Sequence, residues 1–234
     1  MLKPFSTFAA DPVLALLTDS RRTGTRPSPL PLRPTTSLRR TLFIKRCFDL
    51  SLATILFVLT APIVGLSALL VKMTSRGPAF YTQERVGRFG RVFTIYKLRT
   101  MYHHCEHLTG PTWSVPGDPR VTPVGRVLRA LHLDELPQMV NVLRGEMSLI
   151  GPRPERPEIA YRLAKTIEDY NCRLAVLPGI TGHAQVHLPP DTTVADVREK
   201  VRLDRYYLSR LSFWFDMLTL ARTGLKVIGL YRTR

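Results

Sequence analysis

One segment limits what this chain can fold into: residues 50–71 read LSLATILFVLTAPIVGLSALLV and contain no charged side chain. At a helical rise of 1.5 Å per residue, about 22 residues reach roughly 33 Å, enough to cross the hydrocarbon core of a bilayer. A buried helix of this length in a soluble protein would normally carry a polar stripe. The segment therefore predicts a membrane-inserted helix.

Basic residues flank this segment on both sides: Arg39, Arg40, Lys45 and Arg46 before it, and Lys72, Arg76, Arg85, Arg88 and Arg91 after it. Since cytoplasmic loops are enriched in Lys and Arg, both ends are expected on the cytoplasmic side. Pro62 lies near the middle and removes one helical hydrogen bond there. We expect a re-entrant helical hairpin over residues 42–76, with a spanning helix kinked at Pro62 as the alternative.

The charge balance points to an anionic partner, because the net charge is +16 and the isoelectric point is near 10.5. A nucleic acid, an anionic membrane surface and a phosphorylated substrate all fit. A nucleic-acid-binding module needs neither the apolar segment nor paired acids in a basic field, so no nucleic-acid partner is expected. Residues 1–41 are basic and interrupted by Pro, Ser and Thr, which predicts a disordered arm.

Residues 77–234 are predicted to form an α+β catalytic domain, mostly helical with a small sheet. Alternation over residues 92–96 favours a strand hairpin, and helical patterns follow at 123–131, 135–144, 155–175 and 193–210. Over residues 211–230, polar residues at helical spacing (Asp216, Thr219, Thr223 and Lys226) share one stripe among apolar and aromatic side chains. This pattern is typical of an amphipathic helix in the membrane interface, and a buried core helix is the alternative.

Two adjacent acids, Asp134 and Glu135, precede Pro137, which is tolerated in the first turn of a helix. This position would place Asp134 near free backbone amides that favour its ionised form and attract phosphate. An anionic carboxylate beside a phosphate site suits nucleophilic attack on phosphorus. The alternative is that Asp134 only caps the helix.

Basic residues surround this pair along the chain. Arg153 lies in a loop stiffened by Gly151, Pro152 and Pro154, and a fixed guanidinium binds phosphate oxygens well. The expected phosphate-binding residues are Lys97, Arg99, Arg120 and Arg153. His103 and His107 have zinc-like spacing, but no second pair follows at the spacing of a zinc site, so a polar loop is preferred there.

Several motifs occur in a characteristic order: Lys45 to Asp49, Gly77-Pro78, Gln83 to Gly87, Tyr96 to Met101, Asp118-Pro119-Arg120, Leu133 to Asn141, Met147 to Pro154, and Pro178 to Gly182 with Gln185. Together they resemble the bacterial sugar transferases, the monotopic phosphoglycosyl transferases that initiate polysaccharide and glycoconjugate assembly. The resemblance covers about residues 42–230. The departures include Ala61 where Ser is frequent before the membrane proline, and His183 and His187 where Trp and Asn are frequent. The chain shows no large N-terminal membrane domain, which would place it among the smaller members.

The resemblance implies transfer of a sugar-1-phosphate from a UDP-sugar to undecaprenyl phosphate with release of UMP, at the cytoplasmic face of the inner membrane. Asp134 matches the nucleophile that forms a covalent phosphosugar intermediate, and Glu135 matches the second acid of the dyad. Mg²⁺, held partly by Asp134, would offset the diphosphate charge. Lys97 and Arg153 match basic positions, and Asp216 matches a late acidic position, a possible active-site acid. Exopolysaccharide assembly is the implied pathway class, and the sugar itself is not readable from the sequence.

Overall fold

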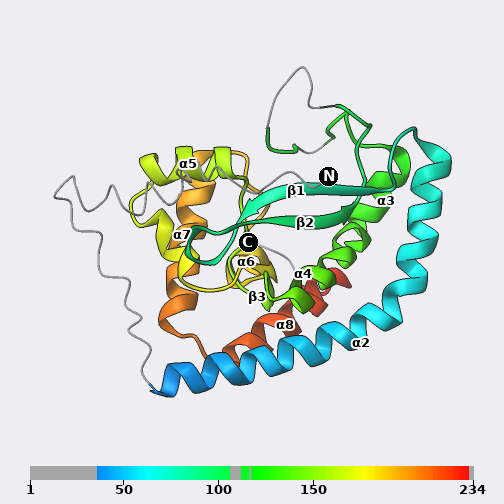
Figure 1. Ribbon diagram of the computed structural model, residues 1–234. Coiled ribbons are helices and arrows are strands. Elements are labelled where there is room, and N and C mark those ends of the chain that lie inside the picture. Colours follow the sequence, from blue (N-terminus) through cyan, green and yellow to red (C-terminus); the bar gives the residue numbers. More distant parts are fainter. Residues whose placement is uncertain (1–35, 106–111, 116, 232–234) are drawn as a thin grey trace, which may run out of the picture.

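The computed structural model describes residues 36–105, 112–115 and 117–231, so almost all of the predicted N-terminal arm lies outside the described residues. The elements follow in the order α2 (Thr36–Thr74), β1 (Phe80–Val86), η1 (Arg88–Gly90), β2 (Val92–Leu98), α3 (Pro123–Ala130), η2 (Leu133–Gln138), α4 (Met139–Arg144), β3 (Ser148–Ile150), α5 (Pro157–Thr166), η3 (Tyr170–Ala175), β4 (Gly179–Thr181), α6 (His183–His187), α7 (Val194–Ser209) and α8 (Phe213–Val227). Here η denotes a 3₁₀ helix. The fold is mostly helical with two small sheets (Figure 1).

Helix α2 contains the apolar segment and is longer than the sequence indicated. It has 39 residues, begins at Thr36 inside the expected arm, and continues through Pro62. Figure 1 shows one bent helix that runs along the rest of the protein and does not double back on itself. A bend agrees with a proline inside a helix, which removes a hydrogen bond and clashes with the preceding turn.

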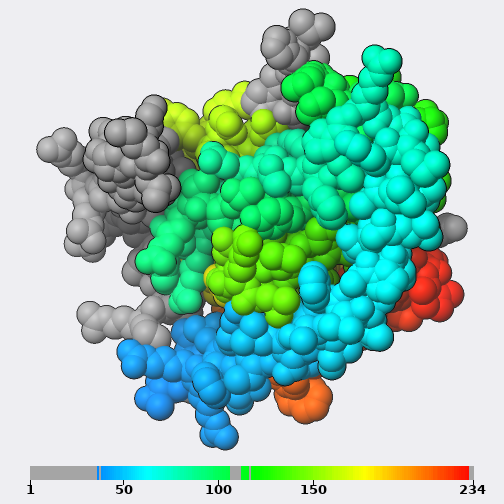
Figure 2. Space-filling view, turned by 45° about the vertical axis from the view of Figure 1, so that its right-hand side comes forward, coloured from blue at the N-terminus to red at the C-terminus, as the bar shows by residue number. Residues whose placement is uncertain are grey.

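The apolar side chains of α2 face outward. Among them, Val58 is 64% exposed and Leu59 is 66% exposed, whereas Lys45 and Asp49 are buried against the rest of the protein. Only 11% of its most apolar 18-residue window is buried, at a mean hydropathy of 2.4. The helix is thus long and apolar enough to cross a membrane, and it is not the buried core helix of a soluble protein. Figure 2 shows its outer side uncovered along the edge of the molecule.

Helix α8, like α2, buries polar side chains against the protein and exposes apolar ones. Its polar stripe points into the protein: Asp216 and Thr219 are buried, and the ammonium of Lys226 donates to the carbonyl of Gln185 at 2.6 Å. Its exposed side chains are apolar, with Trp214 77% and Val227 50% exposed. The predicted stripe is therefore present, and the alternative of a fully buried core helix is wrong.

The strand hairpin expected near residues 92–96 is confirmed. β1 and β2 pair antiparallel in a register that runs from Phe80 opposite Leu98 to Val86 opposite Val92. A second sheet, in which the three-residue strands β3 and β4 pair parallel, has too short a pattern to be read from sequence. The prediction of one continuous helix over 155–175 is wrong, because the chain forms α5 and then the separate 3₁₀ helix η3. The chain leaves α5 at Ile167, and Asp169 adopts a left-handed conformation before η3.

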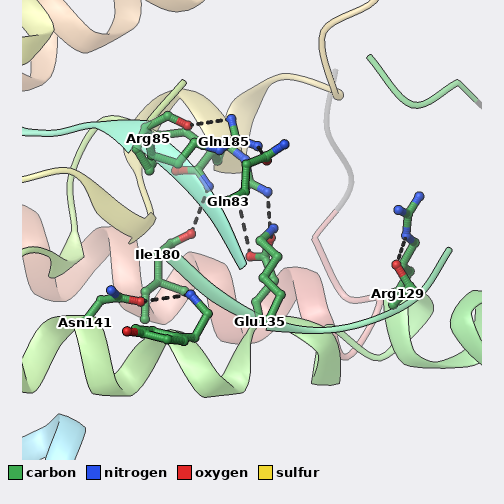
Figure 3. A network of polar contacts seen from close by, with 12 residues as sticks. Gln83, Arg85, Arg129, Glu135, Asn141, Ile180 and Gln185 are labelled. Carbon is green, nitrogen blue, oxygen red and sulfur yellow. Dashed lines mark hydrogen bonds and ion pairs between the residues drawn. The ribbon is translucent and has the colours of Figure 1, made fainter. Parts of the chain in front are cut away.

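Asn141 joins the strand hairpin to the helices and is fully buried. Its side-chain oxygen accepts from the amide of Tyr96 at 3.2 Å, and its nitrogen donates to the carbonyl of Thr94 at 2.7 Å and to Glu146 at 2.7 Å (Figure 3). One side-chain amide therefore provides hydrogen-bond partners for backbone groups on the free edge of β2 and fixes this strand against α4. This fixes Lys97, the next residue on β2 beyond Tyr96, relative to η2.

Candidate active site

The two adjacent acids lie in η2, a six-residue 3₁₀ helix, and not at the end of a longer helix. His132 precedes η2 in a left-handed conformation (φ 55°), and Asp134 and Glu135 form the first turn. Asp134 therefore lies close to a helix N-terminus, as expected, but the N-cap is His132 and the helix is a 3₁₀ helix. A turn this short has little dipole, and burial and neighbouring charges govern the two carboxylates instead.

Glu135 is held between two cations. Its Oε1 lies 2.7 Å from the Nζ of Lys97 and 2.6 Å from a guanidinium nitrogen of Arg153, which also reaches Oε2 at 3.4 Å. Figure 3 shows these contacts converging on Glu135. Burial alone would raise the pKa of Glu135, but the charges and hydrogen bonds of Arg153 and Lys97 hold it well below its usual range. Glu135 is therefore anionic at neutral pH, and its carboxylate is committed to bridging.

Asp134, the other acid of the pair, lacks the bonded partners that Glu135 has. It is 8% exposed, and its carboxylate makes no hydrogen bond or ion pair with any residue that the structure describes. Burial raises its pKa above the usual value, the positive charge of Lys97 works against that rise, and the charge of Glu135 adds to it. The dyad thus contains one bonded carboxylate and one unbonded carboxylate, and the unbonded one is destabilised in its charged form. A carboxylate in this state is the better nucleophile of the two.

Arg129 is a further cation of this site, although it was not among the residues expected to bind phosphate. Its positive charge lowers the pKa of Asp134. Its guanidinium donates to the hydroxyls of Thr100 and Ser114, each at 2.8 Å. Its position at the end of α3, five residues before Asp134, was the available signal.

Gly125 brings α3, and hence Arg129, close to the end of β2. A Cβ at this glycine would collide with the backbone of Thr100, so only glycine allows the contact. The approach sets the distance between the helix that carries Arg129 and the segment that supplies its hydroxyl partner.

The loop that carries Arg153 is fixed from both sides. On one side the amide of Gly151 donates to Thr181 at 2.9 Å, and the amide of Gly179 donates to Pro152 at 2.9 Å. On the other side Arg85 donates to the carbonyl of Pro154 at 3.2 Å and forms an ion pair with Glu155 at 2.9 Å. These contacts hold the backbone on both sides of Arg153, so Arg85 and β4 add to the restraint that the two prolines provide.

Two of the expected phosphate-binding residues point elsewhere. Arg99 binds the carbonyls of Ser75 and Arg76, directly after α2, and is 5% exposed. Arg120 forms an ion pair with Asp118 at 2.7 Å and donates to Thr112 and to the carbonyl of Trp113. The structure thus brings Lys97 and Arg153 to the dyad, and it gives Arg99 and Arg120 protein partners.

Asp216 also lies in a separate cluster. It forms a buried ion pair with Lys45 of α2 at 2.7 Å and accepts from the hydroxyl of Tyr207 at 2.8 Å. Asp49 of α2 accepts from Ser148 at 2.7 Å in the same region. These contacts join α2 and α8 to the start of β3.

The zinc pair considered as an alternative for His103 and His107 depends on His107. This residue lies outside the described residues, so the polar loop that the sequence favours there stays a prediction.

Comparison with known proteins gives one family. The family model described as bacterial sugar transferase matches residues 40–229. A UDP-N-acetylgalactosamine-undecaprenyl-phosphate N-acetylgalactosaminephosphotransferase of Aeromonas hydrophila is 43% identical over 77% of this chain and 43% of its own length. A UDP-glucose:undecaprenyl-phosphate glucose-1-phosphate transferase of Caulobacter vibrioides is 44% identical over 76% of this chain and 67% of its own. An exopolysaccharide production protein of Rhizobium leguminosarum bv. phaseoli is 35% identical over 75% of this chain and 90% of its own.

The share of each relative that is matched differs widely. This chain spans less than half the length of the Aeromonas relative and about two thirds of the Caulobacter relative. The matched part contains every residue of the site just described, because that site lies between Lys97 and Arg153 and the family model covers residues 40–229.

Proposed function

Because the chain belongs to the bacterial sugar transferase family, we propose that it transfers a sugar-1-phosphate from a UDP-sugar to undecaprenyl phosphate and releases UMP. The proposal includes a covalent phosphosugar-aspartate intermediate on Asp134. The Rhizobium relative supports a role in exopolysaccharide assembly. The relatives named above act on different sugars, so the donor sugar is not part of the proposal.

The single observation that carries the chemistry is the asymmetry of the dyad. Asp134 is buried and unbonded among the described residues, whereas Glu135 is clamped by Lys97 and Arg153. The clamp holds two cations beside the nucleophile, where the phosphate of the donor must come. Fixed cations in a desolvated site stabilise the charge that develops on transferred phosphoryl oxygens.

The reaction then runs in two displacements. A carboxylate oxygen of Asp134 forms a bond to the β-phosphorus of the UDP-sugar, and the bond from that phosphorus to the bridging oxygen breaks, so that UMP leaves with the electron pair. A phosphate oxygen of undecaprenyl phosphate next forms a bond to the same phosphorus. The bond to Asp134 breaks, and undecaprenyl diphosphate sugar is the product. Lys97, Arg129 and Arg153 would neutralise the phosphate oxygens in both steps.

The donor set fits a Mg²⁺ ion that is bound largely by the substrate. Among the residues that the structure describes, no group of three His, Cys, Asp or Glu side chains is arranged to hold a metal. Asp134 is the unbonded carboxylate of the site, and Mg²⁺ is usually held by one or two carboxylates together with substrate phosphates and water. Asp134 would help to hold the ion, and the ion would offset the charge of the diphosphate.

For the membrane, we propose that α2 enters and leaves the same face of the cytoplasmic membrane, with the bend at Pro62 inside the lipid and the catalytic domain in the cytoplasm. The outward apolar faces of α2 and α8 support this, as do the basic residues at both ends of the apolar segment. Residues 1–41 are proposed to add electrostatic attraction to anionic lipid. With Cys105 and Cys172 replaced by Ser, the native Cys47, exposed just before the apolar segment, and a cysteine placed at Lys72 would both react with a membrane-impermeant thiol reagent only in inverted vesicles. Reaction of one from each side would establish a spanning helix.

The test of the chemistry is an incubation of the detergent-solubilised enzyme with UDP-sugars and Mg²⁺ in the absence of undecaprenyl phosphate. We expect about one equivalent of UMP per enzyme and a mass increase of one sugar-phosphate on the peptide that contains Asp134, removed when the acceptor is added. Release of UDP would instead identify transfer of sugar without phosphate. UMP that appears only with the acceptor would indicate direct transfer and overturn the covalent intermediate.

A further inference from the structure

A second polar assembly leads away from the dyad and ends at a cavity. Ser114, which binds the guanidinium of Arg129, also donates to Asp118 at 3.1 Å. Asp118 is bound by the side chain of Arg120, which lowers the pKa of Asp118 far below its usual value. Arg120 in turn holds Thr112 by its hydroxyl and Trp113 by its carbonyl. These bonds fix the short segment 112–115 relative to the cation that faces Asp134.

The segment 112–115 forms one wall of a cavity of about 410 Å³. The other walls come from α5 and the beginning of α7, with Ile159, Leu163 and Val194 as apolar lining. A volume of this size falls in the range of small-molecule sites, which are about 300–1,000 Å³. Trp113 and Val115 line the cavity directly on either side of Ser114, so the cavity begins one residue away from the partner of Arg129.

The polar groups in the lining are hydroxyls, one guanidinium and one indole nitrogen. The hydroxyl of Thr112 accepts from Arg120 and retains its own proton to donate, while those of Thr166 and Thr192 donate within the protein and retain acceptor capacity. The guanidinium of Arg162 makes no hydrogen bond or ion pair with a described residue. The indole nitrogen of Trp113 is buried and has no partner in the part of the chain that the structure describes.

We propose that this cavity binds the glycosyl group of the nucleotide-sugar donor, with Trp113 against its apolar face and the threonines and Arg162 at its hydroxyls. A sugar presents hydroxyl groups around an apolar ring face, and the lining offers both kinds of contact. The described residues of the lining include no carboxylate and no side-chain amide to read the edge of a uracil base. The diphosphate stays at Lys97, Arg129 and Arg153, and the sugar extends past Ser114 into the cavity.

A sugar site here also accounts for the motif Asp118-Pro119-Arg120. The arginine of this motif binds protein groups, and those groups belong to the residues that form the cavity wall. The motif therefore acts as a positioning element for the sugar site. The inference rests on the proposed function, since a sugar bound here must be attached to the diphosphate at the dyad.

The first test uses the fluorescence of Trp113. The chain has two tryptophans, so the Trp214→Phe variant leaves Trp113 as the sole indole. We expect UDP-glucose or UDP-N-acetylgalactosamine to change its emission and UMP to leave it unchanged. An equal response to UMP would assign the cavity to the nucleoside and overturn the inference. No response to any donor, in an enzyme that still releases UMP, would remove the cavity from the active site while leaving the proposed function standing.

The second test fills the cavity. Val194→Phe is expected to lower kcat/KM for the preferred UDP-sugar at least about tenfold, and to leave inhibition by UMP unchanged. The matched control is Val92→Phe, because Val92 is similarly exposed and lies on β2 outside the cavity. Equal effects of both variants would contradict the assignment. A donor that changes Trp113 emission without any UMP release would support the sugar site and overturn the proposed transfer.

Discussion

Two clusters of this protein contain the same kinds of groups and use them differently. The dyad cluster consists of Asp134, Glu135, Lys97 and Arg153, and the anchor cluster consists of Asp49, Asp216, Lys45, Tyr207 and Ser148. Each contains two carboxylates in a largely buried setting. In the anchor cluster both carboxylates have bonded partners: Asp216 binds Lys45 and Tyr207, and Asp49 accepts from Ser148 and from the amide of Leu149. In the dyad cluster only Glu135 is bonded to a described residue.

The difference separates a structural site from a reactive one. A buried carboxylate whose two oxygens both accept hydrogen bonds from fixed protein groups is held in place and is less available to a substrate. A buried carboxylate without a bond destabilises the folded state and is available to a ligand. By this criterion Asp134 is the acid that we propose for catalysis, whereas the bonds of Asp216 attach α8 to α2 and α7. The criterion depends on hydrogen bonds and burial together, because all three acids Asp134, Asp216 and Asp49 are buried.

The largest changes in activity and in unfolding free energy are expected when the two acids of the dyad are neutralised one at a time. Asp134→Asn should lower UMP release at least about 10³-fold, because the nucleophile is lost. Its free energy of unfolding should stay equal or rise at pH 7. Since burial raises the pKa of Asp134, its ionised form disfavours folding above that pKa, and the amide removes this cost.

Glu135→Gln is the matched control, with the same change of charge one residue later. It should destabilise the protein, because Lys97 and Arg153 lose their shared anion. The pKa of Glu135 is depressed in the folded state, so its contribution is present above its unfolded pKa and is lost as the pH falls through the folded pKa. Urea unfolding followed by circular dichroism measures both variants. Equal destabilisation by the two changes would break the comparison between bonded and unbonded acids.

Next in size is Asp216→Asn, which removes the partner of a buried ammonium. The expected loss is about 3–5 kcal/mol of unfolding free energy, since Lys45 is left as an uncompensated charge. Lys45→Met combined with Asp216→Leu should recover most of it. Glu199→Gln, at an exposed ion pair with Arg202, should change stability by less than about 1 kcal/mol. If Asp216→Asn instead abolished UMP release without altering the unfolding curve, Asp216 would be an active-site acid.

A smaller change is expected from Arg153→Lys, which keeps the charge and loses the planar fork. Arg153 contacts both oxygens of Glu135, so kcat/KM should fall about 10–100-fold, the equivalent of one to two charge-assisted hydrogen bonds. Arg99→Lys is the control, because its guanidinium binds carbonyls next to α2. We expect it to lower the melting temperature and leave KM for the donor unchanged. A rise in that KM would restore Arg99 as a phosphate ligand.

The acid limb of the pH profile of kcat/KM should show the slightest change. Activity should be lost as the pH falls through the pKa of Asp134, which burial raises above the usual aspartate value. The charge of Lys97 opposes that rise, so Lys97→Met should move the limb to higher pH by about one unit. Lys72→Met, a change on α2 away from the dyad, should leave the limb in place. A limb that moves to lower pH in Lys97→Met would contradict the assignment of this titration to Asp134.

Features that depend on local composition could be predicted from the amino-acid sequence alone. The uncharged run within α2 predicts a helix long and apolar enough to cross a membrane, because helix length and hydropathy are properties of the local sequence. The polar stripe of α8 follows from helical spacing. The pair Asp134-Glu135 and the motifs around it were sufficient to identify the family that the comparisons establish.

Which groups meet in space depends on the packing of the folded chain. In the sequence, Arg99, Arg120 and Arg153 were equally good candidates for binding phosphate. In the structure, Arg99 binds the end of α2 and Arg120 binds the cavity wall, whereas Arg153 reaches Glu135, 18 positions away. The ion pair of Lys45 with Asp216 spans 171 positions. A partner at such a separation is set by how the helices pack and where the loops cross, which no local pattern records. For the same reason, the direction in which the stripe of α8 faces, and the unbonded state of Asp134, emerge only with the tertiary structure.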